Sequence, residues 1–242
     1  MRNNPLAALA GLGLALGAPA HAAPGDPEAP DRAADPAAGP ARPVWPNDFT
    51  ARLEALALLQ TLNAELLSHD SATLTLDRWC DAHHLASPAK VVAVRDRGAS
   101  KPVTAELRKT LGAGDAEPIR YRRVQLRCGR HVLSEADNWY VPARLTAEMN
   151  HQLDTSDVAF GRAVQALHFQ RRTLSARLLW SPLPDGWEIA GGPLPDAAAR
   201  ALAIPHAVLE HRAVLTLPDG TPFSAVTETY TEQVLAFPPP PR

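Results

Sequence analysis

The sequence predicts a single α+β domain in which a mostly antiparallel sheet is flanked by helices. Helical periodicity dominates the chain from residue 47 onward, and strand-like alternation dominates from residue 121 onward. Turn signals also join successive strands closely enough for antiparallel pairing. With 242 residues, of which 45% are hydrophobic, the chain can bury one full-sized core.

The first elements are predicted to be helices. Asn47 or Asp48 can cap a helix in which apolar residues follow at helical spacing. Ser71 can cap a second segment, SATLTLDRWCDAHH, whose first β-branched residues could also suit a strand, whereas residues 77–84 look helical. Two shorter helices are expected over residues 143–153 and 158–167.

Strands are predicted where polar and apolar residues alternate. Residues 90–98 alternate and end on a glycine. Residues 121–127 and 132–141 are typical of a hairpin with Gly129 at its turn. The remaining strands are expected over residues 168–180 and on both sides of the turn at 218–220.

Residues 1–22 are typical of a secretory signal peptide. Arg2 precedes a short apolar stretch, and the small residues on either side of His21 predict cleavage after Ala22. The apolar stretch is shorter than the roughly 20 residues that span a bilayer, so a membrane anchor is the less favoured alternative. We therefore expect a periplasmic or secreted protein with no membrane attachment after cleavage.

The mature chain is expected to hold one folded unit between two Pro-rich segments. Residues 23–46 are rich in Pro, Ala, Gly and Asp and predict a disordered tether. The folded domain is expected over residues 47–236, and residues 237–242 form a short Pro-rich tail. A formal charge of −2 gives no basic excess that would indicate a nucleic-acid partner. We expect a monomer.

Cys80 and Cys128 are the only cysteines in the chain. Export to an oxidising compartment predicts that they form a disulfide, with a pair of buried free thiols as the alternative. Two cysteines alone cannot make a structural zinc site. The neighbouring histidines His83 and His84 do not share a helix face, so no metal site is predicted.

Arg122 is the first candidate for a binding role. Val124 and Leu126 belong to the core, and Arg122 shares their parity along the strand. Arg123 and Arg127 point to the opposite, solvated face. An inward arginine needs a carboxylate partner or a ligand anion, because an unpaired buried charge is very costly.

Glu228 is the matching candidate on the last strand, because it shares the parity of Val226. A desolvated glutamate can serve as an acid or base. Parity alone favours a structural salt bridge from Arg122 to Glu135 or Glu228. The functional alternative is a cavity in which Arg122 binds a carboxylate and Glu228 meets a hydroxyl at the other end of a small ligand.

Other candidates carry weaker signals. Gly161, after Phe160, would let a backbone amide approach a ligand closely. Arg212 could add a positive group to the same cavity. The sequence has no nucleophile elbow, zinc-protease motif, P-loop or dinucleotide-binding motif at a meaningful place.

The order of these segments resembles the chorismate pyruvate-lyase family, whose relatives share the ligand-binding fold of UTRA regulator domains. The resemblance spans about residues 50–236 and lies in order and spacing rather than in one motif. Its segments are SATLTL, KVVAVRDRG, Arg122-x-Val124-x-Leu126, ADNWYVP, FGR, the strand QRRTLSARL, HRAVL, a Gly turn and Thr227-Glu228. The chain is particularly similar to exported members that carry RCG, LSEADNWYVP and ETYT.

The resemblance implies a cofactor-independent carbon–oxygen lyase that eliminates pyruvate from chorismate and forms 4-hydroxybenzoate. Arg122 would hold the aromatic carboxylate, and Glu228 would contact the ring hydroxyl and take part in the loss of pyruvate. Backbone amides of Phe160 and Ala72 would complete the pocket. The family uses no metal or cofactor.

Two departures from the family pattern keep several functions open. Chorismate is made in the cytoplasm, whereas this chain carries an export signal. The family's Pro-Leu-Gly is replaced by Ala159-Phe160-Gly161, which narrows the pocket. The protein could be a lyase, a non-catalytic binder of a small aromatic carboxylate, or a structural protein with an Arg122–Glu228 salt bridge.

Overall fold

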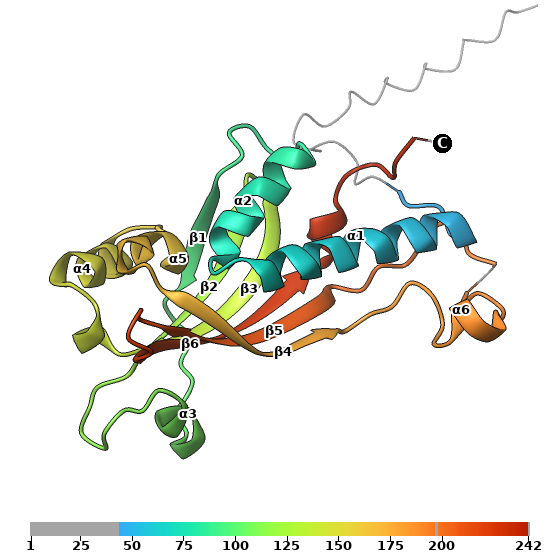
Figure 1. Ribbon diagram of the computed structural model, residues 1–242. Helices are drawn as coiled ribbons and strands as arrows, with labels where there is room; N and C mark the ends of the chain where they lie inside the picture. Colours follow the sequence, from blue (N-terminus) through green and yellow to red (C-terminus); the bar gives the residue numbers. More distant parts are fainter. Residues whose placement is uncertain (1–43, 197, 242) are drawn as a thin grey trace, which may run out of the picture. The chain divides into compact units, whose positions relative to one another are not determined.

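Six strands form one antiparallel sheet in the order β1-β2-β3-β6-β5-β4 (Figure 1). The computed structural model describes residues 44–196 and 198–241. The strands are β1 Val91–Asp96, β2 Arg120–Cys128, β3 His131–Tyr140, β4 Gln170–Leu178, β5 Ala207–Thr216 and β6 Pro222–Thr231. The α-helices are α1 Phe49–Ser68, α2 Ala72–Ala82, α3 Ala105–Thr110, α4 Ala147–Thr155, α5 Phe160–Ala163 and α6 Trp187–Ala190. Short 3-10 helices are η1 Pro142–Arg144, η2 Gln165–Leu167 and η3 Glu232–Leu235.

The α+β class predicted from the sequence is confirmed, and both hairpins form. β2 pairs with β3 across Gly129, and β5 pairs with β6 across the turn at 218–220. The segment after Ser71 is helical from Ala72 onward, because the Ser71 hydroxyl oxygen accepts from the amide of Leu74 and caps the helix. The strand alternative for its first residues is therefore wrong.

Four of the helices differ from the prediction. The helix expected over 143–153 begins only at Ala147, where Thr146 caps it, and a 3-10 turn precedes it. The helix expected over 158–167 divides into α5 and η2. α3, which begins at a Thr104 cap, and α6 have no counterpart among the predicted helices.

Alternation along the strands gives the sheet an inner and an outer face. Inner residues such as Leu126 and Val226 pack with α1 and α2 in the largest core cluster. Outer residues such as Val214 and Ala225 pack in a smaller cluster with Leu107 of α3. Figure 1 shows α1 and α2 across one face of the sheet and α3 beyond the other. α1 contributes its apolar stripe to the inner core through Ala51, Ala55, Leu59, Leu62 and Leu66.

The folded core extends past both ends of the expected domain, 47–236. Trp45 is buried, and its indole nitrogen donates to the Leu235 carbonyl at 3.1 Å. Phe237 is also buried, and its ring stacks on His83 with 4.0 Å between ring centroids. The folded part of the chain therefore includes Trp45 at its N-terminal side and Phe237 at its C-terminal side.

No helix within residues 44–196 and 198–241 is both long enough and apolar enough to cross a membrane. The expected signal peptide, 1–22, and nearly all of the expected tether lie outside the described residues. Export therefore stays a prediction.

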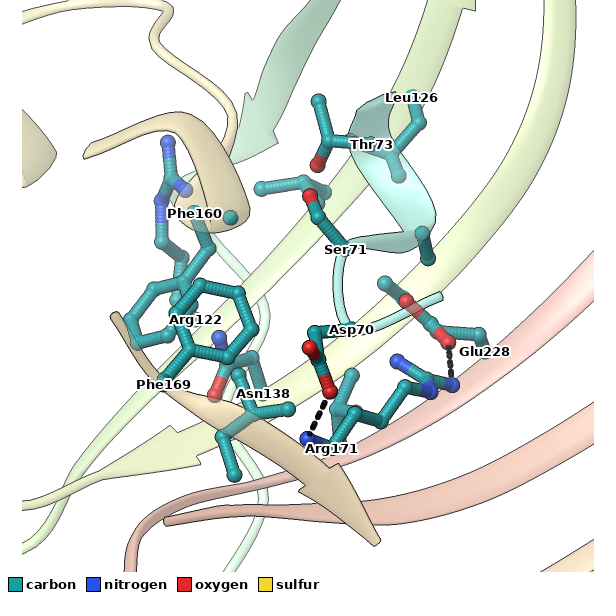
Figure 2. A pocket seen from close by; sticks show the side chains of 16 residues that line it. Asp70, Ser71, Thr73, Arg122, Leu126, Asn138, Phe160, Phe169, Arg171 and Glu228 are labelled. Atoms are coloured by element: carbon teal, nitrogen blue, oxygen red, sulfur yellow. Dashed lines mark hydrogen bonds and ion pairs between the residues drawn. The ribbon is translucent and has the colours of Figure 1, made fainter. Parts of the chain in front are cut away.

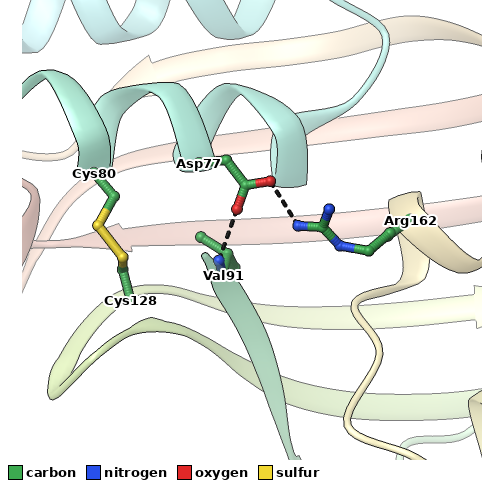
Figure 3. The surroundings of a disulfide bond; sticks show 5 residues. All are labelled: Asp77, Cys80, Val91, Cys128 and Arg162. Atoms are coloured by element: carbon green, nitrogen blue, oxygen red, sulfur yellow. Dashed lines mark hydrogen bonds and ion pairs between the residues drawn. A yellow bond between two sulfur atoms is a disulfide. The ribbon is translucent and has the colours of Figure 1, made fainter. Parts of the chain in front are cut away.

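α2 is fastened to three other elements (Figure 3). A disulfide joins Cys80 of α2 to Cys128 at the end of β2. The Asp77 carboxylate accepts from the amide of Val91 at 2.7 Å and from Arg162 Nη2 of α5 at 2.6 Å. These links fix the helix whose N-terminal end overlies the sheet, and they fix α5 beside it.

We expect the disulfide to stabilise the fold substantially. It closes a loop of sequence separation 48, so the double variant Cys80→Ser/Cys128→Ser should lose about 4 kcal/mol of unfolding free energy in the chain-entropy model. Guanidinium titrations of both proteins measure this, and a reductant should lower the stability of the native protein only. Equal stability of the two proteins, or two reactive thiols in protein from an oxidising compartment, would contradict the expectation.

Candidate ligand-binding cavity

A small cavity lies between the inner face of the sheet and the N-terminal ends of α2 and α5 (Figure 2). Its volume is about 40 Å³, which is room for a few water molecules and well below the 150 Å³ of a cavity that binds benzene. Phe160 and Phe169 contribute aromatic rings to the lining. Its polar lining consists of Asp70, Ser71, Thr73, Arg122, Asn138, Arg171 and Glu228.

Arg122 is the largest of the fully buried side chains, with 2% of its surface exposed. Its Nη2 donates to the Val158 carbonyl at 3.0 Å. Its Nε and Nη1 are buried and have no acceptor in the described part of the chain. Burial, together with repulsion from Arg95, lowers the pKa of Arg122 to about 10. The inward direction predicted for this residue is confirmed, and its charge has no carboxylate partner among the described residues.

Glu228 is also buried and directed inward, but its partner is not Arg122. Arg171 Nη2 donates to Glu228 Oε2 at 2.5 Å, and the Tyr230 hydroxyl donates to the same oxygen at 3.1 Å. Glu135, the other expected partner, pairs with Arg123 at 3.1 Å. The salt bridge expected from Arg122 to either glutamate is therefore wrong, and Arg171 holds the place in the pair that the sequence suggested for Arg122.

Arg171 reaches the cavity from the edge strand β4. Its backbone amide donates to Asp70 Oδ1 at 2.8 Å, which fastens β4 to the loop between α1 and α2. Burial is the largest single influence and lowers the pKa of Arg171, but Glu228, Tyr230 and Asp70 together outweigh it and raise this pKa. Its Nε has no acceptor within the described residues.

The buried charges of the cavity do not balance. Arg122 and Arg171 bring two positive charges, and Glu228 brings one negative charge. Asp70, the other carboxylate of the lining, is exposed to solvent. Figure 2 places the Arg122 guanidinium beside Phe160, across the cavity from the Arg171–Glu228 pair. One buried positive charge at one end of the cavity thus has no carboxylate within ion-pair distance, and Asp154 and Asp157 attract it only from farther away.

The structure brings most of the predicted site residues together. Arg122, Glu228, Phe160, Gly161 and Ala72 all line the cavity. Phe160 and Ala72 are the first residues of α5 and α2, so their amides lie at helix N-termini.

Arg212 does not line this cavity, so its predicted place is wrong. It is exposed on the outer face of β5, where it pairs in register with Thr227 of β6. The preceding residue, His211, points inward and lies opposite Glu228. The two-residue period of the strand sends these neighbours to opposite faces.

Arg171, Asn138 and Ser71 are site residues that the sequence reasoning missed. Arg171 shares the parity of buried Phe169, which was a usable signal. Asn138 follows the inward parity of β3, and its amide oxygen accepts from the Ser224 hydroxyl at 2.7 Å. Its Nδ2 has no acceptor in the described part of the chain and can donate to a ligand.

The donors of the cavity outnumber its acceptors. Arg122, Arg171 and Asn138 all carry N–H groups without acceptors among the described residues, and Ser71 and Thr73 add hydroxyls. Glu228 is the one buried carboxylate in the described lining. This set suits an acceptor-rich anion with a hydrogen-bond donor at the Glu228 end. The described residues contain no group of three or more His, Cys, Asp or Glu that could hold a metal ion.

A curated relative shows the family of this chain. The uncharacterized protein y4mC of Sinorhizobium fredii is 60% identical over 197 residues, which cover 81% of this chain and 83% of y4mC. The chain belongs to the y4mC family. No protein-family model matches the sequence.

Solved structures similar to this chain include domains of transcriptional regulators, all at low TM-scores. The effector domain of PhnF from Mycobacterium smegmatis has a TM-score of 0.40 and 9% identity, covering 67% of this chain and 89% of that domain. The ligand-binding domain of a GntR-family regulator from Bordetella bronchiseptica has a TM-score of 0.32 and 14% identity, covering 58% and 79%. A possible transcriptional regulator, YydK of Bacillus subtilis, has a TM-score of 0.34 and 17% identity, and 58% of each chain is covered. At these scores the likeness carries no argument about function.

Gly161 allows α5 to approach α2 closely. A Cβ built at Gly161 would lie 2.7 Å from Ser71 Oγ and 3.2 Å from Thr73 Oγ1. We expect Gly161→Ala to lower the unfolding free energy by about 1–3 kcal/mol through overpacking. In a Ser71→Ala background the same change should cost less, because the nearest clashing atom is gone. Denaturant titrations of the four proteins measure this coupling, and strict additivity would contradict the close approach.

His211 should make stability pH-dependent. Its Nε2 donates to Asn63 Oδ1 at 2.8 Å, and burial lowers its pKa to about 4, with Glu228 opposing and Arg171 adding to the shift. The folded state thus binds a proton on His211 more weakly than the unfolded state does. The contribution of neutral His211 to the unfolding free energy is therefore complete above the unfolded-state pKa and is lost as the pH falls toward about 4. Between about pH 7 and 5 the titration of His211 should lower the free energy of unfolding by about 2 kcal/mol.

The matched control is His211→Gln, which keeps a donor for Asn63 and cannot titrate. Unfolding midpoints measured across this pH range should fall less steeply in the variant than in the native protein. Parallel pH profiles for the two proteins would show that His211 does not contribute.

Proposed function

We propose that this protein binds a small organic monoanion in the inner cavity, with the charged group of the ligand against Arg122. The observation that carries the proposal is the buried guanidinium, whose Nε and Nη1 have no acceptor in the described part of the chain. Leaving such a group unsatisfied costs several kcal/mol. A ligand carboxylate would satisfy both donors in the bidentate manner that arginine favours.

The lining supports a ligand that has a second polar group opposite its carboxylate. Glu228 can accept a hydrogen bond from a hydroxyl at the far end of the cavity, and Asn138 can donate one at the side. A small aromatic carboxylate such as 4-hydroxybenzoate has this pattern. A cavity of about 40 Å³ does not hold a ring, so Phe160 and Phe169 would have to turn aside when it binds.

The contacts of Glu228 favour binding without turnover. Its Oε2 accepts from both Arg171 and Tyr230, so two donors of the protein already occupy the oxygen that would have to serve a departing group. We therefore propose a binding protein rather than a lyase. We further propose that it is exported, on the support of the signal-like residues 1–22.

Arg122→Met and Arg171→Met should behave in opposite ways. Arg122→Met removes an uncompensated buried charge, so the unfolding free energy should stay equal or rise. Arg171→Met breaks the buried pair with Glu228 and should lower it by about 3–5 kcal/mol. Chemical denaturation measures both. A loss in Arg122→Met as large as that in Arg171→Met would show that Arg122 is structural.

Ligand binding is measured by calorimetry with acetate, benzoate, 4-hydroxybenzoate and the neutral 4-hydroxybenzamide. A monoanion should bind to the native protein, the neutral amide should not, and Arg122→Met should weaken binding at least about 30-fold. Equal binding by Arg122→Met, or no monoanion binding, would overturn the proposal. Pyruvate release from chorismate that Glu228→Gln abolishes would replace it with the lyase.

A further inference from the structure

The outer face of the sheet carries a second and larger pocket, lined by residues of α3 and of the strands. Its volume is about 290 Å³, close to the ~300 Å³ at which small-molecule sites begin. Trp139, Arg212 and Thr227 belong to the strands beneath it, and residues 102–110 stand beside them. This pocket has no role in the proposed function, because the monoanion cavity lies on the opposite face.

The lining combines apolar surface with an unsatisfied donor. Leu174 is 50% exposed although it is a large apolar residue, and Pro102 and Leu107 lie in the same lining. The Trp139 indole Nε1 is buried and has no acceptor in the described part of the chain. Buried side-chain donors without a partner are rare in folded proteins, so Trp139 joins the apolar lining with an indole N–H that the described residues leave unsatisfied.

The two charged residues of the pocket are unpaired, unlike their neighbours. Other charges of this face form ion pairs, as Lys101 does with Asp137 and Arg177 does with Glu210. For Arg212 on β5 and Glu106 on α3, the described residues provide neither an ion pair nor a side-chain hydrogen bond. One positive and one negative group therefore line the same pocket from two different elements.

We propose that the outer pocket binds a small zwitterion with an apolar body, the chemistry of a free α-amino acid. Arg212 would hold the carboxylate, since a guanidinium pairs with it through two parallel hydrogen bonds. Glu106 would pair with the ammonium group. The apolar side chain would lie on Leu174 and on the Trp139 ring, which would also attract the nearby ammonium through its π face.

The test is a titration of the purified protein with L-leucine, followed by the indole N–H signals in nitrogen-15 correlation spectra. The chain has five tryptophans, and Trp139→Phe identifies the signal of Trp139. We expect a saturable shift of that signal. Arg212→Gln and Glu106→Gln should each weaken binding about 10-fold or more, and Arg177→Gln, an exposed arginine on the neighbouring strand, should not.

Comparison ligands decide the chemical class. L-leucinamide lacks the carboxylate and 4-methylpentanoate lacks the ammonium group, so each should bind at least about 10-fold more weakly than L-leucine. Equal binding of either compound would overturn the zwitterion proposal. The absence of a saturable Trp139 shift at about 10 mM L-leucine, or unchanged affinity in both glutamine variants, would also overturn it. Arg122→Met should bind L-leucine normally, which separates this test from that of the inner cavity.

Discussion

The inner cavity depends on one uncompensated charge, the buried guanidinium of Arg122. A strand that places arginine among core residues incurs a desolvation cost of several kcal/mol unless a partner offsets it. The inward carboxylate of Glu228 could have been that partner, but Arg171 and Tyr230 occupy it. The fold therefore keeps Arg122 charged, buried and available to an anion.

The elements around this charge are held so that they cannot readily move to relieve it. The disulfide and the Asp77 contacts fasten α2 to β1, β2 and α5. Gly161 lets α5 lie directly against Ser71. Helices fastened in this way over a buried charge are expected where ligand binding, rather than stability, determines which residues are kept. The aromatic rings of Phe160 and Phe169 are then the parts of the lining that must adjust to a larger ligand.

Strand parity predicted which way individual side chains point, and it did so correctly for Arg122 and Glu228. It could not predict their partners, because those depend on strand order. Arg171 lies on β4, which is separated from β6 by β5, and alternation within one strand contains no information about this arrangement. Arg212 was misplaced because β5 is apolar on both faces near its end, which hides the two-residue period.

The two faces of the sheet present different chemistry from adjacent residues. Glu228 points to the inner cavity, and its neighbour Thr227 lines the outer pocket. The inner site is small and donor-rich, whereas the outer one is larger and has one charge of each sign. A six-stranded sheet with helices on both faces can thus carry two independent sites of different specificity.

Bromide soaking of crystals of the native protein tests the central claim most directly. Bromide is a monatomic monoanion that fits a cavity of about 40 Å³ without movement of the aromatic rings, and its anomalous scattering locates it without ambiguity. We predict an anomalous peak within contact distance of Arg122 Nε or Nη1. Anomalous peaks at surface arginines with none at Arg122 would contradict the claim that this buried guanidinium binds an anion.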